Sequence, residues 1–182
     1  MDPIISLIDE NDTIKGFATK SDVHKKGLLH RAFSIFVMND KDELLLQKRA
    51  ADKYHSASLW TNTCCSHAVP GESLQTTAYI RLKEEMGFQC NLRWLFSFRY
   101  RAELDNGLVE NELDHVFFGF FDGIPVINPK EASAFKWMSF DAIKNDMVKN
   151  PLNYTVWFRL IFDNFIEHFD KSKEHCNNCT IL

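Results

Sequence analysis

The segment Gly71–Phe88, which reads "GESLQTTAYIRLKEEMGF", has the pattern of a helix with a marked beginning and end. We predict a helix over residues 72–86, because one glycine precedes it and a second follows where helices commonly stop. At about 100° per residue, Leu74, Ala78 and Leu82 form one apolar stripe. This stripe predicts the face that the helix turns toward the core.

The same helix carries a carboxylate where an apolar side chain is expected. Glu85 falls roughly 20° from Leu74 and so lies inside the stripe. Arg81 lies at the edge of the stripe, and Glu84 points away from it. An unpaired buried charge is strongly unfavourable, so Glu85 needs a partner. Either Glu85 pairs with Arg81 one turn earlier, or it meets a cation while Arg81 meets an anionic ligand.

The segments outside this helix show strand and helix patterns. The expected hairpins pair residues 5–9 with 14–20, 31–38 with 43–49, and 92–102 with 108–121. A further strand is expected at 135–140, and further helices within 139–150 and 155–169. The pattern indicates one α+β domain over residues 1–170, with an antiparallel-rich sheet covered by helices. We expect the polar residues 171–182 to form a flexible tail.

Composition and charge restrict the class of protein. The 182 residues carry a formal charge of -4, with basic and acidic residues interleaved, which disfavours a nucleic-acid-binding surface. The acidic N-terminus is unlike a signal peptide, and no apolar run approaches the roughly 20 residues of a membrane span. Five cysteines in such a chain favour free thiols over a disulfide framework. We therefore predict a cytoplasmic protein without a membrane partner.

Acidic residues alternate along the segment "VENELD", residues 109–114. Alternate residues of a strand share one face, so Glu110, Glu112 and Asp114 are expected to lie side by side. They would repel one another unless a positive group sits among them. A solvated outer face is the ordinary explanation of such a pattern, and a cation site is the alternative.

Histidines and thiols recur near strand ends. His24 and His30 precede the apolar segment 31–38, and "TNTCCSHAVPGES" places Cys64 and Cys65 shortly before His67. A lone histidine is usually structural, but three of them with two aligned glutamates match the ligand set of a divalent transition metal. For the thiols, a metal site, a disulfide, a nucleophile and an ordinary strand end all stay open.

Four basic residues also lie at strand ends, in loops or at the helix edge, namely Lys20, Arg49, Lys53 and Arg81. Most surface lysines and arginines are simply solvated. Basic residues at such positions can also bind a diphosphate through forked and point-charge hydrogen bonds.

Several segments together resemble a known family. "GLLHRAFSIFVMN", "LLLQKRA", "WTNTCCSHAVPGES", "RLKEEMGF", "FRYRA" and "GLVENELDHVF" are similar, in order and spacing, to the type 1 isopentenyl-diphosphate Δ-isomerases of the Nudix superfamily. The resemblance implies a Nudix-like fold. In the superfamily's helix signature, Ser66, Ile80 and Arg81 replace the usual Gly, Arg and Glu. Because the hydrolases of the superfamily use that glutamate, the resemblance disfavours hydrolysis here.

The resemblance also implies roles for individual residues. The catalytic groups that it implies are Cys65 and Glu112, with Tyr100 beside the glutamate. The implied ligands of a tightly bound divalent metal (Mn2+, Zn2+ or Mg2+) are His24, His30, His67, Glu110 and Glu112. A second, substrate-bound Mg2+ is implied at Glu85 and the backbone carbonyl of Cys65. The implied substrate-binding residues are Lys20, Arg49, Lys53 and Arg81 for the diphosphate and Trp157 for the hydrocarbon.

The reaction implied is the interconversion of isopentenyl diphosphate and dimethylallyl diphosphate, by a monomer or weak homodimer. A Nudix-type diphosphohydrolase is the alternative enzyme class, but it leaves Cys65 and the histidines unexplained. A catalytically silent Nudix-like binding module and a structural zinc protein explain still less of the pattern. The terminal "CTIL" has the form of a prenylation box, but Thr180 is polar where an aliphatic residue is usual, so we interpret it as chance.

Overall fold

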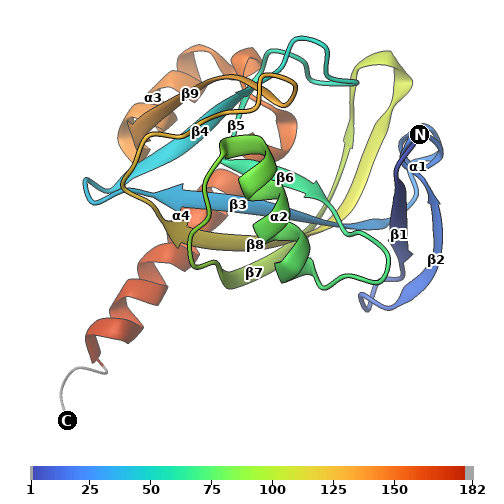
Figure 1. Ribbon diagram of the computed structural model, residues 1–182, viewed down its shortest axis with the longest axis horizontal. Coiled ribbons are helices and arrows are strands. Elements are labelled where there is room, and N and C mark those ends of the chain that lie inside the picture. The colour runs from blue at the N-terminus through green and yellow to red at the C-terminus, as the bar shows by residue number, and fades with distance from the viewer. Residues whose placement is uncertain (1, 179–182) are drawn as a thin grey trace.

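The computed structural model describes residues 2–178 and shows one mixed β-sheet between two helices (Figure 1). Helix α2, Leu74–Met86, lies over one face of the sheet, and helix α4, Val156–Asn178, lies over the other. The α+β class with helices on the sheet is therefore confirmed. The strands are β1 (Ile4–Ile8), β2 (Ile14–Thr19), β3 (His30–Met38), β4 (Glu43–Arg49), β5 (Trp60–Thr61), β6 (Cys64–His67), β7 (Arg93–Glu103), β8 (Val109–Phe120) and β9 (Ala132–Ser139). The remaining elements are α1 (Lys20–Lys26), α3 (Phe140–Lys149) and two short 3-10 turns, η1 (Asp105–Gly107) and η2 (Pro151–Asn153).

Strand β3 is central to the sheet. It pairs in parallel with β8 along its whole length and antiparallel with β6, and it meets β1 and β4 near its ends. The predicted hairpins β1–β2 and β7–β8 are both present. The predicted hairpin of 31–38 with 43–49 is present but short, because β3 and β4 pair antiparallel only at Met38 and Leu44 before they diverge. Along the rest of its length, β4 pairs antiparallel with β9 and β5.

Residues on β3 alternate between two apolar cores. Ile35 and Val37 belong to the cluster that packs on α2, whereas Phe36 and Met38 belong to the cluster that packs on α4. The core on the α4 side is rich in aromatic residues, and the ring of Phe36 stacks there on that of Phe165 at 4.1 Å between centroids. Side chains of one strand thus enter opposite halves of the protein, as the two-residue period of a strand requires.

Helix α2 begins and ends at specific caps. The Ser73 hydroxyl accepts a hydrogen bond from the Thr76 backbone N–H, so the helix starts two residues later than predicted. Gly87 ends it in a left-handed conformation, with φ of 79°. A Cβ at Gly87 would lie 2.3 Å from the Val126 carbonyl oxygen, so a larger residue there would displace the chain before β9. The predicted burial of Glu85 is confirmed.

Helix α4 continues past the predicted end of the domain. It runs to Asn178, so the described part of the expected tail is helical, and flexibility of residues 171–182 stays a prediction. The "CTIL" residues lie outside the described part of the chain. Among the described helices, none combines the length and apolar character needed to span a bilayer.

Truncating the α4 core should destabilise the whole domain. Phe165 is fully buried, and Phe165→Ala is expected to lower the free energy of unfolding by about 3–5 kcal/mol. Leu160 lies on the same helix but is 48% exposed, so Leu160→Ala should cost much less, about 1 kcal/mol or below. Urea unfolding of both variants checks this. Equal losses would show that α4 does not pack as described.

Candidate active site and metal centre

The acidic face of β8 is buried. Glu110, Glu112 and Asp114 are 3%, 7% and 1% exposed, so the solvated-face explanation of this pattern was wrong. These residues occupy the N-terminal half of the face whose continuation, Val116 and Phe118, packs in the α4 core. Because Val116 and Phe118 pack in the core, the carboxylates on the same face of β8 also point into the protein.

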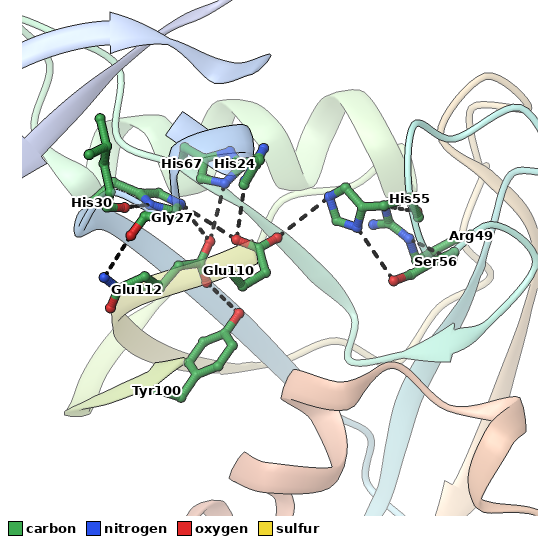
Figure 2. A network of polar contacts seen from close by, with 12 residues as sticks. His24, Gly27, His30, Arg49, His55, Ser56, His67, Tyr100, Glu110 and Glu112 are labelled. Carbon is green, nitrogen blue, oxygen red and sulfur yellow. Dashed lines mark hydrogen bonds and ion pairs between the residues drawn. The ribbon is translucent and has the colours of Figure 1, made fainter. Parts of the chain in front are cut away.

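Three imidazoles from three separate elements meet these carboxylates, as Figure 2 shows for the labelled side chains. His24 is in α1, His30 begins β3, and His67 ends β6. One Glu112 oxygen, Oε1, lies 3.2 Å from His30 Nε2 and 3.1 Å from His67 Nε2. The Nε2 atom of His24 lies 3.1 Å from Glu110 Oε2. One ligand atom from each of the five side chains falls within 4.8 Å of all the others.

The charges of this cluster depend on one another. Burial lowers the pKa of His30, but its contacts with Glu110 and Glu112 outweigh burial and raise that pKa to about 10. For His67, burial prevails and lowers the pKa to about 4. Burial raises the pKa of Glu110, but the neighbouring histidines outweigh it and bring that pKa well below the usual range. Without a metal ion, a protonated His30 thus faces the ionised carboxylate of Glu110.

The cluster suits a divalent metal ion. Among the side chains that the structure describes, both ring nitrogens of His24 and Oε2 of Glu110 are buried without a hydrogen-bond partner. His24 Nε2 and Glu110 Oε2 are close enough for an ion pair, but they are not aligned for a hydrogen bond. Buried polar atoms are rarely left unpaired. Imidazole nitrogens and carboxylate oxygens are also the donors that Zn2+, Mn2+ and similar ions bind.

A pocket opens beside this cluster and contains most of the residues singled out by the sequence. Of the residues predicted to form the site, Lys20, Arg49, Lys53, Cys65, His67, Arg81, Glu85, Tyr100, Glu110, Glu112 and Trp157 line it. His24 and His30 do not, because they lie fully buried behind the two glutamates.

The two adjacent cysteines point to opposite faces of β6. Cys64 belongs to the core under α2, whereas Cys65 packs against the α4 side and lines the pocket. Burial raises the pKa of the Cys65 thiol to about 12, so the thiol keeps its proton at neutral pH. No disulfide joins Cys64, Cys65 and Cys90, which confirms free thiols for these three.

Two aromatic side chains are held in the pocket by hydrogen bonds. The Tyr100 hydroxyl donates to Glu112 Oε2 at 2.6 Å, so both oxygens of Glu112 are in polar contact. The Trp157 ring is buried, and its Nε1–H donates to the Thr61 hydroxyl at 2.9 Å. The Arg49 guanidinium carbon lies 5.2 Å from the centre of the Trp157 ring.

The other end of the pocket is basic. Arg81 Nη2 is 2.6 Å from Glu85 Oε1, so the ion pair considered for these residues exists. The second Glu85 oxygen accepts a hydrogen bond from Gln47 at 2.9 Å. Lys20 also lines the pocket, and burial lowers the pKa of its ammonium group. The pocket thus has a carboxylate–imidazole end and a cationic end.

Sequence reasoning missed three residues of the site. Gln47, His55 and Glu131 line the pocket. His55 Nε2 is 3.5 Å from Glu110 Oε1, and burial lowers the pKa of His55 to about 3. These three carry no signal in the sequence, because loops and distant strands bring them in. Asp114, which was expected beside the two glutamates, is buried and accepts a hydrogen bond from Ser34 at 2.7 Å.

Comparisons with known proteins place the chain in a family. The NUDIX domain family model matches residues 28–158. Photorhabdus laumondii "Isopentenyl-diphosphate Delta-isomerase 2" is 53% identical, over 90% of this chain and 92% of the relative. Pectobacterium atrosepticum "Isopentenyl-diphosphate Delta-isomerase" is 46% identical, over 93% of this chain and 94% of the relative.

Solved structures show the same fold at low sequence identity. A crystal structure from Deinococcus radiodurans has a TM-score of 0.68 at 16% identity, covering 81% of this chain and 90% of its own. A MutT protein from Methanosarcina mazei has a TM-score of 0.63 at 19% identity, and the match covers 76% of this chain and 94% of that protein. These two likenesses concern the fold alone.

Metal binding should stabilise the protein through Glu110. With Mn2+ or Zn2+ at 100 times the dissociation constant, the metal-free protein should gain about 2.7 kcal/mol in unfolding free energy. Glu110→Gln removes one ligand charge and should lose most of that gain at the same concentration. The exposed Glu103 offers a matched control, since Glu103→Gln should respond like the unsubstituted protein. Thermal unfolding with and without metal measures this, and an undiminished gain in Glu110→Gln would contradict the site.

Proposed function

Since this chain belongs to the Nudix family, and within it to the isopentenyl-diphosphate Delta-isomerases, we propose that its pocket interconverts isopentenyl diphosphate and dimethylallyl diphosphate. The observation that carries the proposal is the presence, in one pocket, of a protonated thiol at Cys65 and a carboxylate at Glu112 on the same side of the sheet. The cationic end of the same pocket suits a diphosphate.

The reaction dictates what such a site must provide. Moving the double bond requires a proton to be added to the terminal methylene carbon and another to be removed from the carbon on the other side of the branch. An unactivated alkene is a weak base, so its protonation gives a carbocation-like species that water would trap. The site must therefore hold one proton donor and one acceptor and exclude water.

Cys65 and Glu112 meet these requirements as a pair. Burial raises the pKa of Glu112, but the histidines beside it outweigh burial and lower that pKa, so Glu112 is ionised while Cys65 is protonated. The pair thus holds one transferable proton. One member gives its proton to the terminal methylene carbon, and the other takes a proton from the substrate. After one isomerisation the proton has moved from one member to the other, so it must return before the next turnover in the same direction. Tyr100 orients Glu112 through its hydroxyl and leaves the second oxygen to the histidines.

The hydrocarbon would lie against Trp157. Its ring is fixed by the hydrogen bond to Thr61 and forms a flat apolar wall of the pocket. A ring face stabilises a nearby positive charge by ~1–2 kcal/mol in a site of this kind. Its neighbour Arg49 belongs to the cationic end, so the alkene of a bound substrate would lie close to the diphosphate-binding residues.

The chain provides ligands for two metal ions in this proposal. His24, His30, His67, Glu110 and Glu112 would hold a tightly bound Mn2+, Zn2+ or Mg2+, and Glu85 with the Cys65 carbonyl would hold a substrate-bound Mg2+. Such ions supply positive charge that acidifies a ligated carboxyl group and neutralises a diphosphate. Lys20, Arg49, Lys53 and Arg81 would bind the diphosphate oxygens directly.

Removing the thiol should abolish isomerisation without unfolding the protein. Cys65→Ala is expected to lower kcat by roughly 10²–10⁴-fold or more, because one of the two proton-transferring groups is lost. Incubation with isopentenyl diphosphate and Mg2+, followed by measurement of acid-labile allylic product, provides the assay. The matched control is Cys64→Ala, which removes the neighbouring thiol on the opposite face of β6 and should keep turnover within a few-fold.

Glu112→Gln tests the opposite group. It keeps the size of the side chain and should likewise lower kcat by roughly 10²–10⁴-fold. Wild-type turnover by either Cys65→Ala or Glu112→Gln would overturn the assignment. Phosphate release from nucleoside diphosphate derivatives, without allylic product, would instead indicate a Nudix hydrolase.

A further inference from the structure

A carboxylate already sits between two cations at the basic end of the pocket. Glu131 lies just before β9 and forms an ion pair through Oε2 with the ammonium group of Lys53. Its other oxygen, Oε1, is 3.1 Å from Arg81 Nη2. All three side chains line the pocket. One anion therefore bridges two of the groups to which the proposed function assigns the diphosphate.

We propose that Glu131 is an internal counter-anion that occupies the place of the substrate diphosphate between Lys53 and Arg81 and so sets the pocket's affinity for diphosphates. The proposal rests on the proposed function, because it takes these cations as the diphosphate site. A diphosphate must displace the carboxylate from at least one of the two cations before it can bind there. Because the competing carboxylate belongs to the protein itself, it raises the dissociation constant of a diphosphate by a fixed factor.

The backbone around Glu131 is anchored, so displacement involves its side chain. The Glu131 carbonyl accepts a hydrogen bond from Ala50 N–H at 3.0 Å, and its own N–H donates to the Asn128 carbonyl at 2.9 Å. Asn128 N–H in turn donates to the Glu85 carbonyl at 2.9 Å, which ties this turn to the end of α2. The Glu131 side chain is 20% exposed, so rotation can bring its carboxylate into water.

The two cations differ in what remains when Glu131 leaves. Arg81 keeps its ion pairs with Glu84 and Glu85, at 2.7 and 2.6 Å. Lys53, by contrast, has no second carboxylate partner among the described residues. Lys53 is therefore the cation that Glu131 chiefly neutralises, and the one that a diphosphate gains when the carboxylate leaves.

Glu131 carries its charge throughout the neutral range. Burial raises the pKa of its carboxyl group, but Lys53 and Arg81 outweigh burial and lower that pKa. Replacement by Gln removes the charge and keeps an amide oxygen of similar reach. The Gln variant therefore distinguishes two possible roles of the Glu131 charge. The charge either competes with the bound ligand or holds Lys53 and Arg81 in place.

Titration calorimetry with inorganic pyrophosphate, at fixed excess Mg2+, tests the proposal without requiring catalysis. Glu131→Gln should bind pyrophosphate about three- to tenfold more tightly than the unsubstituted protein, and Glu131→Ala should also bind more tightly. The matched control is Glu84→Gln. Glu84 also pairs with Arg81, but it is exposed and does not line the pocket, so the affinity should change less than about twofold.

The opposite results overturn the proposal. If Glu131 instead holds Lys53 and Arg81 in place, both substitutions at position 131 will weaken pyrophosphate binding or leave it unchanged. Absence of binding by every protein also overturns it. In the isomerase assay, Glu131→Gln should lower KM and leave kcat unchanged, as expected for a change in uniform binding. A chain that binds pyrophosphate as predicted but forms no allylic product would refute the proposed function and leave the inference on Glu131 standing.

Discussion

The site depends on the mutual neutralisation of charges that the sheet carries into the interior. Glu110 and Glu112 enter because the apolar residues further along the same face of β8 pack in the α4 core. In a medium of low dielectric, neighbouring carboxylates are tolerated only with positive partners at contact distance. The N-terminal segment supplies one of these partners, since α1 ends at Gly27 and places His24 beside Glu110. The Gly27 carbonyl also accepts a hydrogen bond from Asn111, which ties α1 directly to β8.

The pocket separates charge along its length, and this separation matches the proposed substrate. One end has carboxylates and imidazoles around Glu112, and the other has ammonium and guanidinium groups around Arg81. Cys65 and Trp157 provide the thiol and the apolar wall of the same pocket. A short hydrocarbon attached to a diphosphate could place its apolar part against Trp157 and its anionic part among the basic side chains. The carboxylate of Glu131 partly neutralises the cationic end, and we infer that this limits how tightly anions bind there.

The alternation of side chains along strands assigns the two cysteines to different environments. Cys64 and Cys65 are chemically identical neighbours, yet one packs under α2 and the other lines the pocket on the α4 side of the sheet. The same alternation on β3 builds two cores from one strand. Strand geometry thus assigns a structural role to one thiol and leaves the other available for chemistry.

The α+β class, the amphipathic helix around Glu85 and the shared face of Glu110 and Glu112 could all be predicted from residue patterns, and the resemblance of the motifs indicated the family. These features depend on residue spacing within single elements, which periodicity records. The pairing of β3 with β6 and β8 rather than along β4, and the burial of the acidic face, became visible only in the folded chain. The fold also placed His55, Gln47 and Glu131 in the pocket, because contacts between distant segments arise from packing that no local pattern encodes.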